Sequence, residues 1–308
     1  MTSARIAVAR SFGPPEVIKI EEHPVPDPAP GQVQVAVRFS GTNPVDARIR
    51  AGRFGGRPPL VFGREFSGTV IRSRDPRFAV GDAVMGAGVQ GASADLIVVD
   101  AERLVHKPES LDWATAGGLL SVGQTALTVL DDLNLPVGSI LLIHGASGGV
   151  GTALIQLAVD RGLTVIGTAS PANHDHLRRL GARPVAYGPG LAERIEEATG
   201  GAPVDASVDL AGTTEAGDIA AAVARAGGIA VTLVPETMSS HGLRLISSRQ
   251  SPERAAALVA AADAGALVLP VEVLPFTEIV EAHRRMDAGH SRGKLVLENA
   301  DNPYLTSL

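Results

Sequence analysis

The sequence has no cysteine and few aromatic residues, with one tryptophan and two tyrosines among its 308 residues. The lack of cysteine excludes disulfide bonds, thiolate metal sites and a cysteine nucleophile. An alanine-rich stretch at residues 255–269 is broken by Asp263 and Gly265, and no run approaches the roughly 20 apolar residues of a membrane span. The net charge of −6 comes from interspersed acids and bases, which disfavours nucleic acid as a partner. Residues 1–13 lack the apolar run of a secretory signal, so we expect a cytoplasmic protein without membrane or nucleic-acid partners.

The first hundred residues differ in pattern from those that follow. They contain short β-branched segments separated by turns rich in proline and glycine, such as PDPAPG at 26–31, a pattern typical of packed strands. From about residue 111, strand-like segments alternate with helix-like ones, which favours a doubly wound parallel sheet. The last forty residues return to strand, helix and strand. The sequence therefore predicts an α/β fold that consists of a β-rich part, a doubly wound parallel sheet and a C-terminal return to strand, helix and strand.

The segment Ser139–Ala158, SILLIHGASGGVGTALIQLA, combines an apolar strand at 139–144, a glycine-rich loop and an amphipathic helix at 149–160. The free N–H groups and partial positive charge of a helix N-terminus favour a diphosphate, and glycine lets the backbone approach it closely. A tight turn that is glycine-rich without binding a ligand is the alternative. We predict that the loop binds the diphosphate of a dinucleotide through Ala146, Ser147, Gly148, Gly149, Val150 and Gly151.

The residue at the end of the next strand, 164–170, indicates which nicotinamide cofactor binds. Folds that bind NADH place an acidic residue roughly 20 positions after the glycine loop, where it contacts the ribose 2′-hydroxyl. Here that residue is Ser170, which can donate a hydrogen bond to a 2′-phosphate. We therefore predict NADPH, with further phosphate contacts from Asn173, Arg178 and Tyr187. The alternatives are that Ser170 and Asn173 cap the following helix and that Arg178 lies on a solvated face.

Six motifs spread over nearly the whole chain point to a known family: GPPEVIKIEE, GTNPVDARIRAG, GREFSGTV, FAVGDAVMG, GASGGVG and RGKLVLE. Together they resemble the zinc-free quinone oxidoreductase (ζ-crystallin-like) branch of the medium-chain dehydrogenase/reductase superfamily. The resemblance implies a GroES-like catalytic domain in residues 1–118 and 267–308 and a Rossmann domain in residues 119–266. It also implies an active site in the cleft between these domains and a homodimer formed through the last Rossmann strand.

The same resemblance bears on metal binding. Zinc-containing members of the superfamily hold catalytic zinc with a cysteine in a segment like GTNPVD and a histidine in one like GREFSG. The corresponding residues here are Asn43 and Arg64, which are not zinc ligands, so we predict no metal. Without a metal to polarise the substrate, hydride must go to an electron-poor acceptor, either a quinone or the β-carbon of an α,β-unsaturated ketone or thioester.

Further site residues follow from the resemblance. Asn43 would face the nicotinamide and the substrate, and Thr125 would lie along the cofactor. The backbone of Leu233 and Val234 would meet the carboxamide, and Lys294 would close the cleft. The alternatives are a turn before the next proline for Asn43 and an ordinary helix position for Thr125.

Four charged or titratable residues near these motifs have structural explanations that we favour. Arg64 and Glu65 are expected to pair with each other or with Asp46. His106 precedes a Lys-Pro turn and His144 ends a buried strand, so neither is assigned to catalysis.

The sequence has no obvious proton donor for the reduced product. Many relatives carry a tyrosine shortly after the NPxD stretch, whereas the two tyrosines here are Tyr187 and Tyr304. A quinone can take its proton from solvent, so this lack does not argue against quinone reduction. From the glycine loop, the resemblance and the missing zinc ligands, we predict an NADPH-dependent reductase of a small-molecule quinone or activated alkene. The alternatives are an enoyl reductase acting on an acyl or polyketide thioester, and a non-catalytic NADPH-binding protein.

Overall fold

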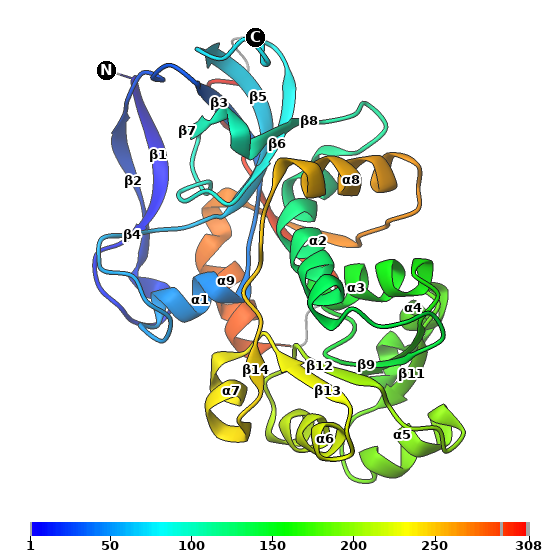
Figure 1. Cartoon of the computed structure of the whole chain (residues 1–308). Coiled ribbons are helices and arrows are strands. Elements are labelled where there is room, and N and C mark those ends of the chain that lie inside the picture. Colours follow the sequence, from blue (N-terminus) through cyan, green and yellow to red (C-terminus); the bar gives the residue numbers. More distant parts are fainter. Residues whose placement is uncertain (1, 290–291, 306–308) are drawn as a thin grey trace. The chain divides into compact units, whose positions relative to one another are not determined.

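The computed structural model describes residues 2–289 and 292–305, which form two compact units (Figure 1). Unit 1 comprises residues within 1–121, 250–265 and 269–308, and unit 2 comprises residues 122–249 and 266–268. The domain boundaries expected from the sequence stay a prediction. In the described part of the chain, no helix combines the length and the apolar character needed to cross a membrane.

Unit 1 is built mainly from two sheets. The smaller has the order β2-β1-β4 and consists of β1 (Thr2–Ala9), β2 (Ile18–Val25) and β4 (Leu60–Val61). The larger has the order β15-β16-β3-β5-β6-β8, with β7 also paired to β3. Its strands are β3 (Gln32–Gly41), β5 (Glu65–Ser73), β6 (Ala83–Ala87), β7 (Leu96–Asp100), β8 (Leu104–His106), β15 (Val271–Pro275) and β16 (Lys294–Glu298).

Short helices join and cover these strands. They are η1 (Pro15–Val17), α1 (Pro44–Arg50), η2 (Ala101–Arg103), α8 (Pro252–Asp263), η4 (Phe276–Glu278) and α9 (Ile279–Ala288). The larger sheet contributes Val35, Phe66 and Val84 to a buried apolar cluster. A second cluster joins Phe62 and Leu297 to residues of α9. Helix α2 (Trp113–Leu133) begins in unit 1 and ends in unit 2.

Unit 2 contains a parallel sheet in the order β11-β10-β9-β12-β13-β14. Its strands are β9 (Ile140–His144), β10 (Thr164–Ala169), β11 (Arg183–Ala186), β12 (Ala206–Asp209), β13 (Ile229–Thr232) and β14 (Arg244–Leu245). The central strand β9 is an almost wholly buried apolar run, as expected for a parallel strand with helices on both faces. The strand order places β9 and β12 at the point where the winding of the sheet reverses.

Helices cover both faces of this sheet (Figure 1). They are α3 (Gly149–Asp160), η3 (Pro171–Asn173), α4 (His174–Arg179), α5 (Leu191–Thr199), α6 (Thr214–Arg225) and α7 (Pro235–His241). Ile195 of α5 packs against Leu142 and Ile166 on one face. On the opposite face, Leu177 of α4 lies against Gly167, where a Cβ atom would be 2.8 Å from Leu177 Cδ2. The α/β fold with a doubly wound parallel sheet is confirmed.

Local sequence signals agree with these elements. The strand expected at 139–144 is β9, the helix expected at 149–160 is α3, and the strand expected at 164–170 is β10. The Thr213 side chain accepts a hydrogen bond from the backbone N–H of Ala216 at the start of α6, the usual N-cap arrangement.

Candidate functional site

The glycine-rich loop joins the carboxyl end of β9 to α3 in unit 2. Gly145 has a φ of +72°, a backbone conformation that favours glycine. A Cβ atom on Gly151 would lie 2.5 Å from the carbonyl oxygen of Ala146, so glycine is required there for the helix to pack against its own loop. At Gly148 a Cβ atom would meet only the carbonyl oxygen of Gly145, at 3.5 Å, among the described residues. Packing among the described residues therefore does not require glycine at position 148, and the space beside Gly148 stays open.

The N-terminus of α3 supplies hydrogen-bond donors to that space. Gly148 is the N-cap residue, and no side chain of the described residues caps the helix. The first N–H groups of a helix have no acceptor within it, which here applies to Gly149, Val150 and Gly151. Ser147, Gly148, Gly149 and Val150 are partly exposed. Exposed N–H groups at a helix N-terminus beside open space fit a diphosphate.

Two neighbouring loops meet at the carboxyl edge of the sheet. The backbone N–H of Leu210 donates a hydrogen bond to the carbonyl oxygen of His144, at 3.1 Å. A Cβ atom on Gly145 would lie 3.2 Å from the backbone nitrogen of Ala211. The segment after β12 therefore packs directly against the first residue of the glycine loop, as in the crevice where doubly wound sheets bind dinucleotides.

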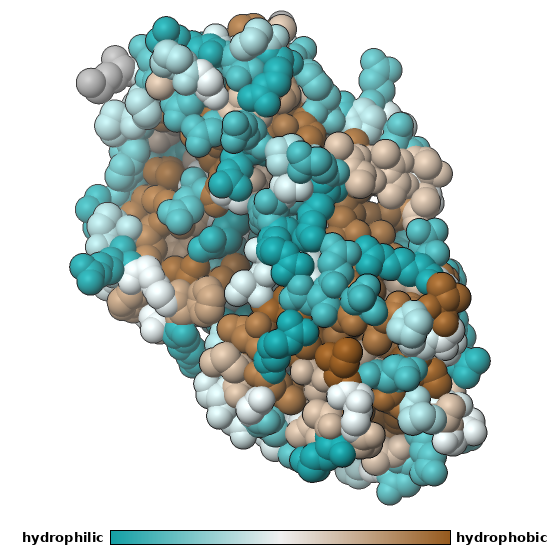
Figure 2. Space-filling model, in the orientation of Figure 1, coloured by the Kyte–Doolittle hydropathy of each residue, from teal (hydrophilic) through white to brown (hydrophobic). Residues whose placement is uncertain are grey.

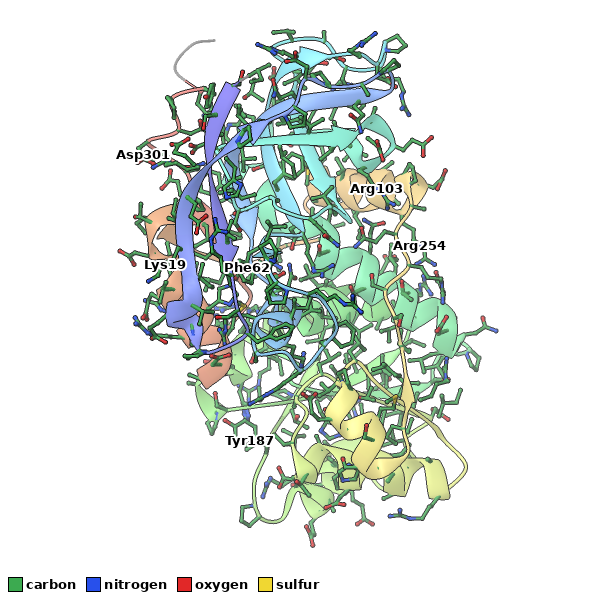
Figure 3. The ribbon with its side chains drawn as sticks, turned by 90° about the vertical axis from the view of Figure 1, so that its left-hand side faces the viewer. Lys19, Phe62, Arg103, Tyr187, Arg254 and Asp301 are labelled. Carbon is green, nitrogen blue, oxygen red and sulfur yellow. The ribbon has the colours of Figure 1, made fainter. Side chains whose placement is uncertain are left out.

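The residues expected to contact a 2′-phosphate lie after β10 and β11. Asn173 Nδ2 donates a hydrogen bond to Ser170 Oγ at 3.2 Å, so the structure brings these two side chains together. Neither makes a capping hydrogen bond to the following helix within the described chain, which disfavours the capping alternative. Arg178 is exposed and pairs with Asp175, Nη1 to Oδ1, at 2.6 Å. Tyr187, labelled in Figure 3, follows β11 and is 47% exposed.

The other residues predicted for the nucleotide side occupy unit 2. Thr125 lies in α2 and its hydroxyl donates a hydrogen bond to Ser248 Oγ at 3.1 Å. The backbone N–H of Leu233 donates to the carbonyl oxygen of Asp209 at 3.0 Å, and that of Val234 donates to Thr232 Oγ1 at 2.9 Å. Because both amides are engaged, a carboxamide would have to donate to the carbonyl oxygens of these residues. The carbonyl oxygen of Val234 already accepts a hydrogen bond from the backbone N–H of Met238 at 3.1 Å, and a carbonyl oxygen can accept two.

In unit 1, Asn43, Glu65 and Lys294 form a buried cluster. Lys294 Nζ lies 2.6 Å from Glu65 Oε1 and donates a hydrogen bond to Asn43 Oδ1 at 2.7 Å. Asn43 Nδ2 donates to Glu65 Oε1 at 3.2 Å, and the backbone N–H of Ser121 donates to Glu65 Oε2 at 2.9 Å. The Lys294 side chain is 4% exposed and fixes the orientation of the Asn43 amide; its role in closing a cleft stays a prediction.

Two glycines make room for this cluster. A Cβ atom on Gly41, at the end of β3, would lie 2.6 Å from Glu65 Oε1. A Cβ atom on Gly118 in α2 would lie 2.7 Å from Lys294 Cγ. Since β3 stands between β16 and β5 in the sheet, the lack of a side chain at Gly41 lets the Glu65–Lys294 pair form beside the end of the intervening strand.

Asp46 and Arg64 adjoin the cluster. Asp46 Oδ2 accepts a hydrogen bond from the backbone N–H of Asn43 at 3.0 Å, at the start of α1. Arg64 Nε lies 3.4 Å from Asp46 Oδ1, so of the two pairings expected for Arg64, the structure has the one with Asp46. Burial raises the pKa of the Asp46 carboxyl to about 6, although Arg64 acts in the opposite direction. Glu65 pairs with Lys294 instead, which local sequence reasoning missed.

The two histidines that the sequence analysis leaves out of catalysis differ in their surroundings. His144 is 1% exposed and burial lowers its pKa to about 4, so it is neutral at pH 7. His106 is exposed, and its Nε2 lies 3.2 Å from the carbonyl oxygen of Arg77. His144 is therefore not a proton donor near neutral pH.

Comparison with known proteins shows where this chain belongs. The alcohol dehydrogenase GroES-like domain family matches residues 29–109, and the zinc-binding dehydrogenase family matches residues 180–297. The chain belongs to the medium-chain dehydrogenase/reductase superfamily, to which both families belong, and the β-rich part is GroES-like as expected. Within the superfamily, the chain is similar to quinone oxidoreductases.

Individual relatives include proteins of two kinds. The chain is 34% identical to a quinone oxidoreductase of Pseudomonas aeruginosa over 174 residues, 55% of this chain and 54% of that protein. It is 40% identical to the pikromycin polyketide synthase component PikAII of Streptomyces venezuelae over 161 residues, 51% of this chain and 4% of the synthase. The match thus spans about half of the first relative and a small part of the second.

Solved structures match over almost the whole chain. The quinone oxidoreductase from Coxiella burnetii superposes with a TM-score of 0.85 and 28% identity, covering 96% of this chain and 99% of that one. A mycobacterial protein solved in complex with NADPH gives a TM-score of 0.84 and 27% identity, with the same coverage.

One matched family is described as zinc-binding, so we tested whether the residues here fit zinc. Asn43 Oδ1 accepts a hydrogen bond from the Lys294 ammonium, and Arg64 lies beside Asp46. Asn43 Oδ1 is thus occupied by a cation of the protein, and the guanidinium of Arg64 has no lone pair to offer a metal. Within residues 2–289 and 292–305, no group of three or more His, Cys, Asp or Glu could hold a metal. The residues do not fit zinc.

Proposed function

We propose that this chain is an NADPH-dependent reductase that needs no zinc and transfers hydride to a quinone or an activated alkene. The proposal is carried by the geometry of the loop before α3. Packing requires glycine at Gly151, whereas the glycine at Gly148 leaves open space beside the loop. That combination is what a backbone cradle for a diphosphate needs. The NADPH complex of a structural neighbour supports the same cofactor.

Each part of the cofactor site has a role in the proposal. The N–H groups at Gly149, Val150 and Gly151 bind the diphosphate. Ser170 and Asn173 bind the 2′-phosphate, because a carboxylate that would repel it is replaced by a hydroxyl at the end of β10. Arg178 and Tyr187 lie near in sequence and contribute at the exposed side, and Thr125 lies along the cofactor. Leu233 and Val234 hold the carboxamide through their carbonyl oxygens. When bound, the reduced nicotinamide supplies the hydride.

The buried cluster of unit 1 presents a rigid polar group to the reaction. Both amide atoms of Asn43 are engaged, by Lys294 and by Glu65, so its orientation is fixed before any substrate arrives. Preorganised dipoles of this kind stabilise charge that develops during reaction. Tyr304 donates its hydroxyl proton to the carbonyl oxygen of Ser3 and Tyr187 belongs to the nucleotide side, so solvent delivers the proton to the product.

A second function has its own support. The polyketide synthase segment is the relative with 40% identity, which favours an enoyl thioester as an alternative acceptor. The chemistry of the chain would be unchanged, since hydride goes to the β-carbon of a conjugated carbonyl in either case. The third candidate function is a non-catalytic NADPH-binding protein. It retains the proposed cofactor site but involves no hydride transfer.

We also propose that the protein forms a homodimer through β14. This strand is an edge of the sheet in unit 2, and edge strands can pair with a second chain. Near it in sequence, Ile229 of β13 is 39% exposed and Met238 of α7 is 37% exposed. Figure 2 shows hydrophobic residues reaching the surface around the position of β13 and β14 in Figure 1.

The test is cofactor oxidation with matched acceptors. NADPH and NADH are each supplied with a quinone, a simple enone and an enoyl thioester, and oxidation is followed at the nicotinamide absorbance band. We expect turnover of the quinone or enone, faster with NADPH. Turnover of the thioester alone would indicate that the protein reduces acyl chains. NADPH binding without any turnover would indicate a non-catalytic binding protein.

A further inference from the structure

Asp209 ends β12 and is completely buried, with none of its surface exposed. Its Oδ1 accepts hydrogen bonds from the backbone N–H groups of Ala211, at 2.9 Å, and Gly212, at 2.8 Å. The carboxylate therefore folds the chain after β12 back over its own strand end. This is the segment that packs against Gly145 of the glycine loop.

The second oxygen of the same carboxylate reaches the neighbouring strand. Thr232, the last residue of β13, donates its hydroxyl to Asp209 Oδ2 at 2.8 Å and accepts a hydrogen bond from the backbone N–H of Val234 at 2.9 Å. Thr232 is also completely buried. A Cβ atom on Gly212 would lie 2.7 Å from Val234 Cγ1, so the two segments are in van der Waals contact.

We infer that Asp209 and Thr232 are positioning residues that set the distance between the glycine loop and the backbone of Leu233 and Val234. One buried carboxylate and one hydroxyl tie both loops to adjacent strand ends. The inference rests on the proposed function, because it assigns the 233–234 backbone to the nicotinamide end of the cofactor and the glycine loop to the diphosphate. Neither side chain needs to touch the cofactor.

The test separates the two ends of NADPH. Thr232→Val keeps the shape of the side chain and removes the hydroxyl, and Thr232→Ser restores the hydroxyl. Dissociation constants are measured for NADPH and for 2′,5′-ADP, which contains the adenosine end alone. We expect Thr232→Val to weaken NADPH binding about tenfold, the loss of one buried hydrogen-bonding group, and to leave 2′,5′-ADP within about twofold. Thr232→Ser is expected to recover most of the NADPH affinity.

Two further variants keep the test decisive. Ser207→Ala removes another buried hydroxyl from β12, one that has no hydrogen-bond partner among the described residues, and it is expected to change neither constant. If Thr232→Val does not fold, Asp209→Asn is used, which keeps one oxygen for the Ala211 and Gly212 N–H groups, removes the charge and places an amide nitrogen toward Thr232.

The possible results are distinct. Unchanged constants for a folded Thr232→Val variant, or equal weakening of both ligands, would overturn the positioning role, because a merely structural residue does not act on one end of the ligand. A wild-type protein that binds neither NADPH nor 2′,5′-ADP would instead refute the proposed function, and this inference with it.

Discussion

Lys294 Nζ lies 2.6 Å from Glu65 Oε1, with 4% and 1% of the two side chains exposed. A buried ion pair of this kind is costly to break from one side, because the remaining charge is left without a partner in a low-dielectric interior. It links the first residue of β16 to the first residue of β5, and both also hold the Asn43 amide. The same pair therefore supports the sheet of unit 1 and the polar group proposed to act on the substrate.

Removing one partner is expected to destabilise the protein more than removing both. Lys294→Met or Glu65→Gln alone should lower the free energy of unfolding by about 3–5 kcal/mol. The double variant should recover part of that loss, because no unpaired charge remains. Chemical denaturation measures all three. The matched control is Glu16→Gln, which breaks the exposed pair between Glu16 and Arg284 and should change little. Additive losses in the double variant would show that the two side chains are not coupled.

Gly148 and Gly151 should respond differently to substitution. The Cβ atom of Gly148→Val would meet only the Gly145 carbonyl oxygen among the described residues, at 3.5 Å, so we expect the variant to fold, to fill the space of the diphosphate and to abolish NADPH binding. Gly151→Ala should lower both stability and NADPH affinity, because its Cβ would lie 2.5 Å from the Ala146 carbonyl oxygen. Thermal unfolding and NADPH titration of each variant measure the two effects. Normal NADPH affinity in Gly148→Val would contradict the assignment of the loop.

The free energy of unfolding should fall as the pH is lowered below 6.5, the pKa of a free histidine side chain. Burial lowers the pKa of His144 from 6.5 to about 4 and that of His283 from 6.5 to about 3. Between those values the unfolded chain binds protons that the native protein does not, so the free energy of unfolding decreases with decreasing pH. Asp46 acts in the opposite direction between pH 3.8 and about 6, because its pKa is raised, but it offsets only one of the two histidines.

His144→Gln isolates one of these contributions. The variant should reduce the pH dependence of the unfolding free energy between pH 6.5 and about 4 by about one proton. Denaturant titrations at a series of pH values give this slope for both proteins. A slope equal to that of the wild type would mean that His144 binds protons equally in the native and unfolded states.

Arg178 should contribute to the preference for NADPH over NADH. It is exposed and paired with Asp175, so binding a phosphate requires it to exchange one anionic partner for another. Arg178→Ala should lower the ratio of kcat/KM for NADPH to that for NADH. Asp175→Asn should raise the ratio, because it releases the guanidinium. If neither variant changes the ratio, the 2′-phosphate is bound by other groups, of which Ser170 and Asn173 are the first candidates.

The parts of the fold that depend on local signals could be predicted from the sequence. The β9–loop–α3 unit has its apolar run, its glycines and its helix within twenty residues, and the structure has these elements where the pattern places them. The ion pair between Lys294 and Glu65 has no such signal, because its partners are far apart in sequence and meet only through the order of the strands β16, β3 and β5.

The same reason explains the role of Asp209. Within the segment ASVDLAG it resembles any acid at the end of a strand, and its bond to Thr232 depends on the parallel pairing of β12 with β13. The family resemblance predicts Leu233 and Val234 as site residues, but their backbone amides are used by Asp209 and Thr232. Which backbone atoms remain for a ligand is a property of the folded sheet.

The central claim, hydride transfer from NADPH, is tested most directly by isotope transfer. NADPH deuterated at C4 of the nicotinamide, with each face labelled in a separate sample, is supplied with an enone, and the product is examined by mass spectrometry and NMR. We predict that one of the two labelled forms places deuterium on the β-carbon of the product, while the α-carbon takes its proton from solvent. Product without deuterium from either form, or no product at all with bound NADPH, would contradict the account.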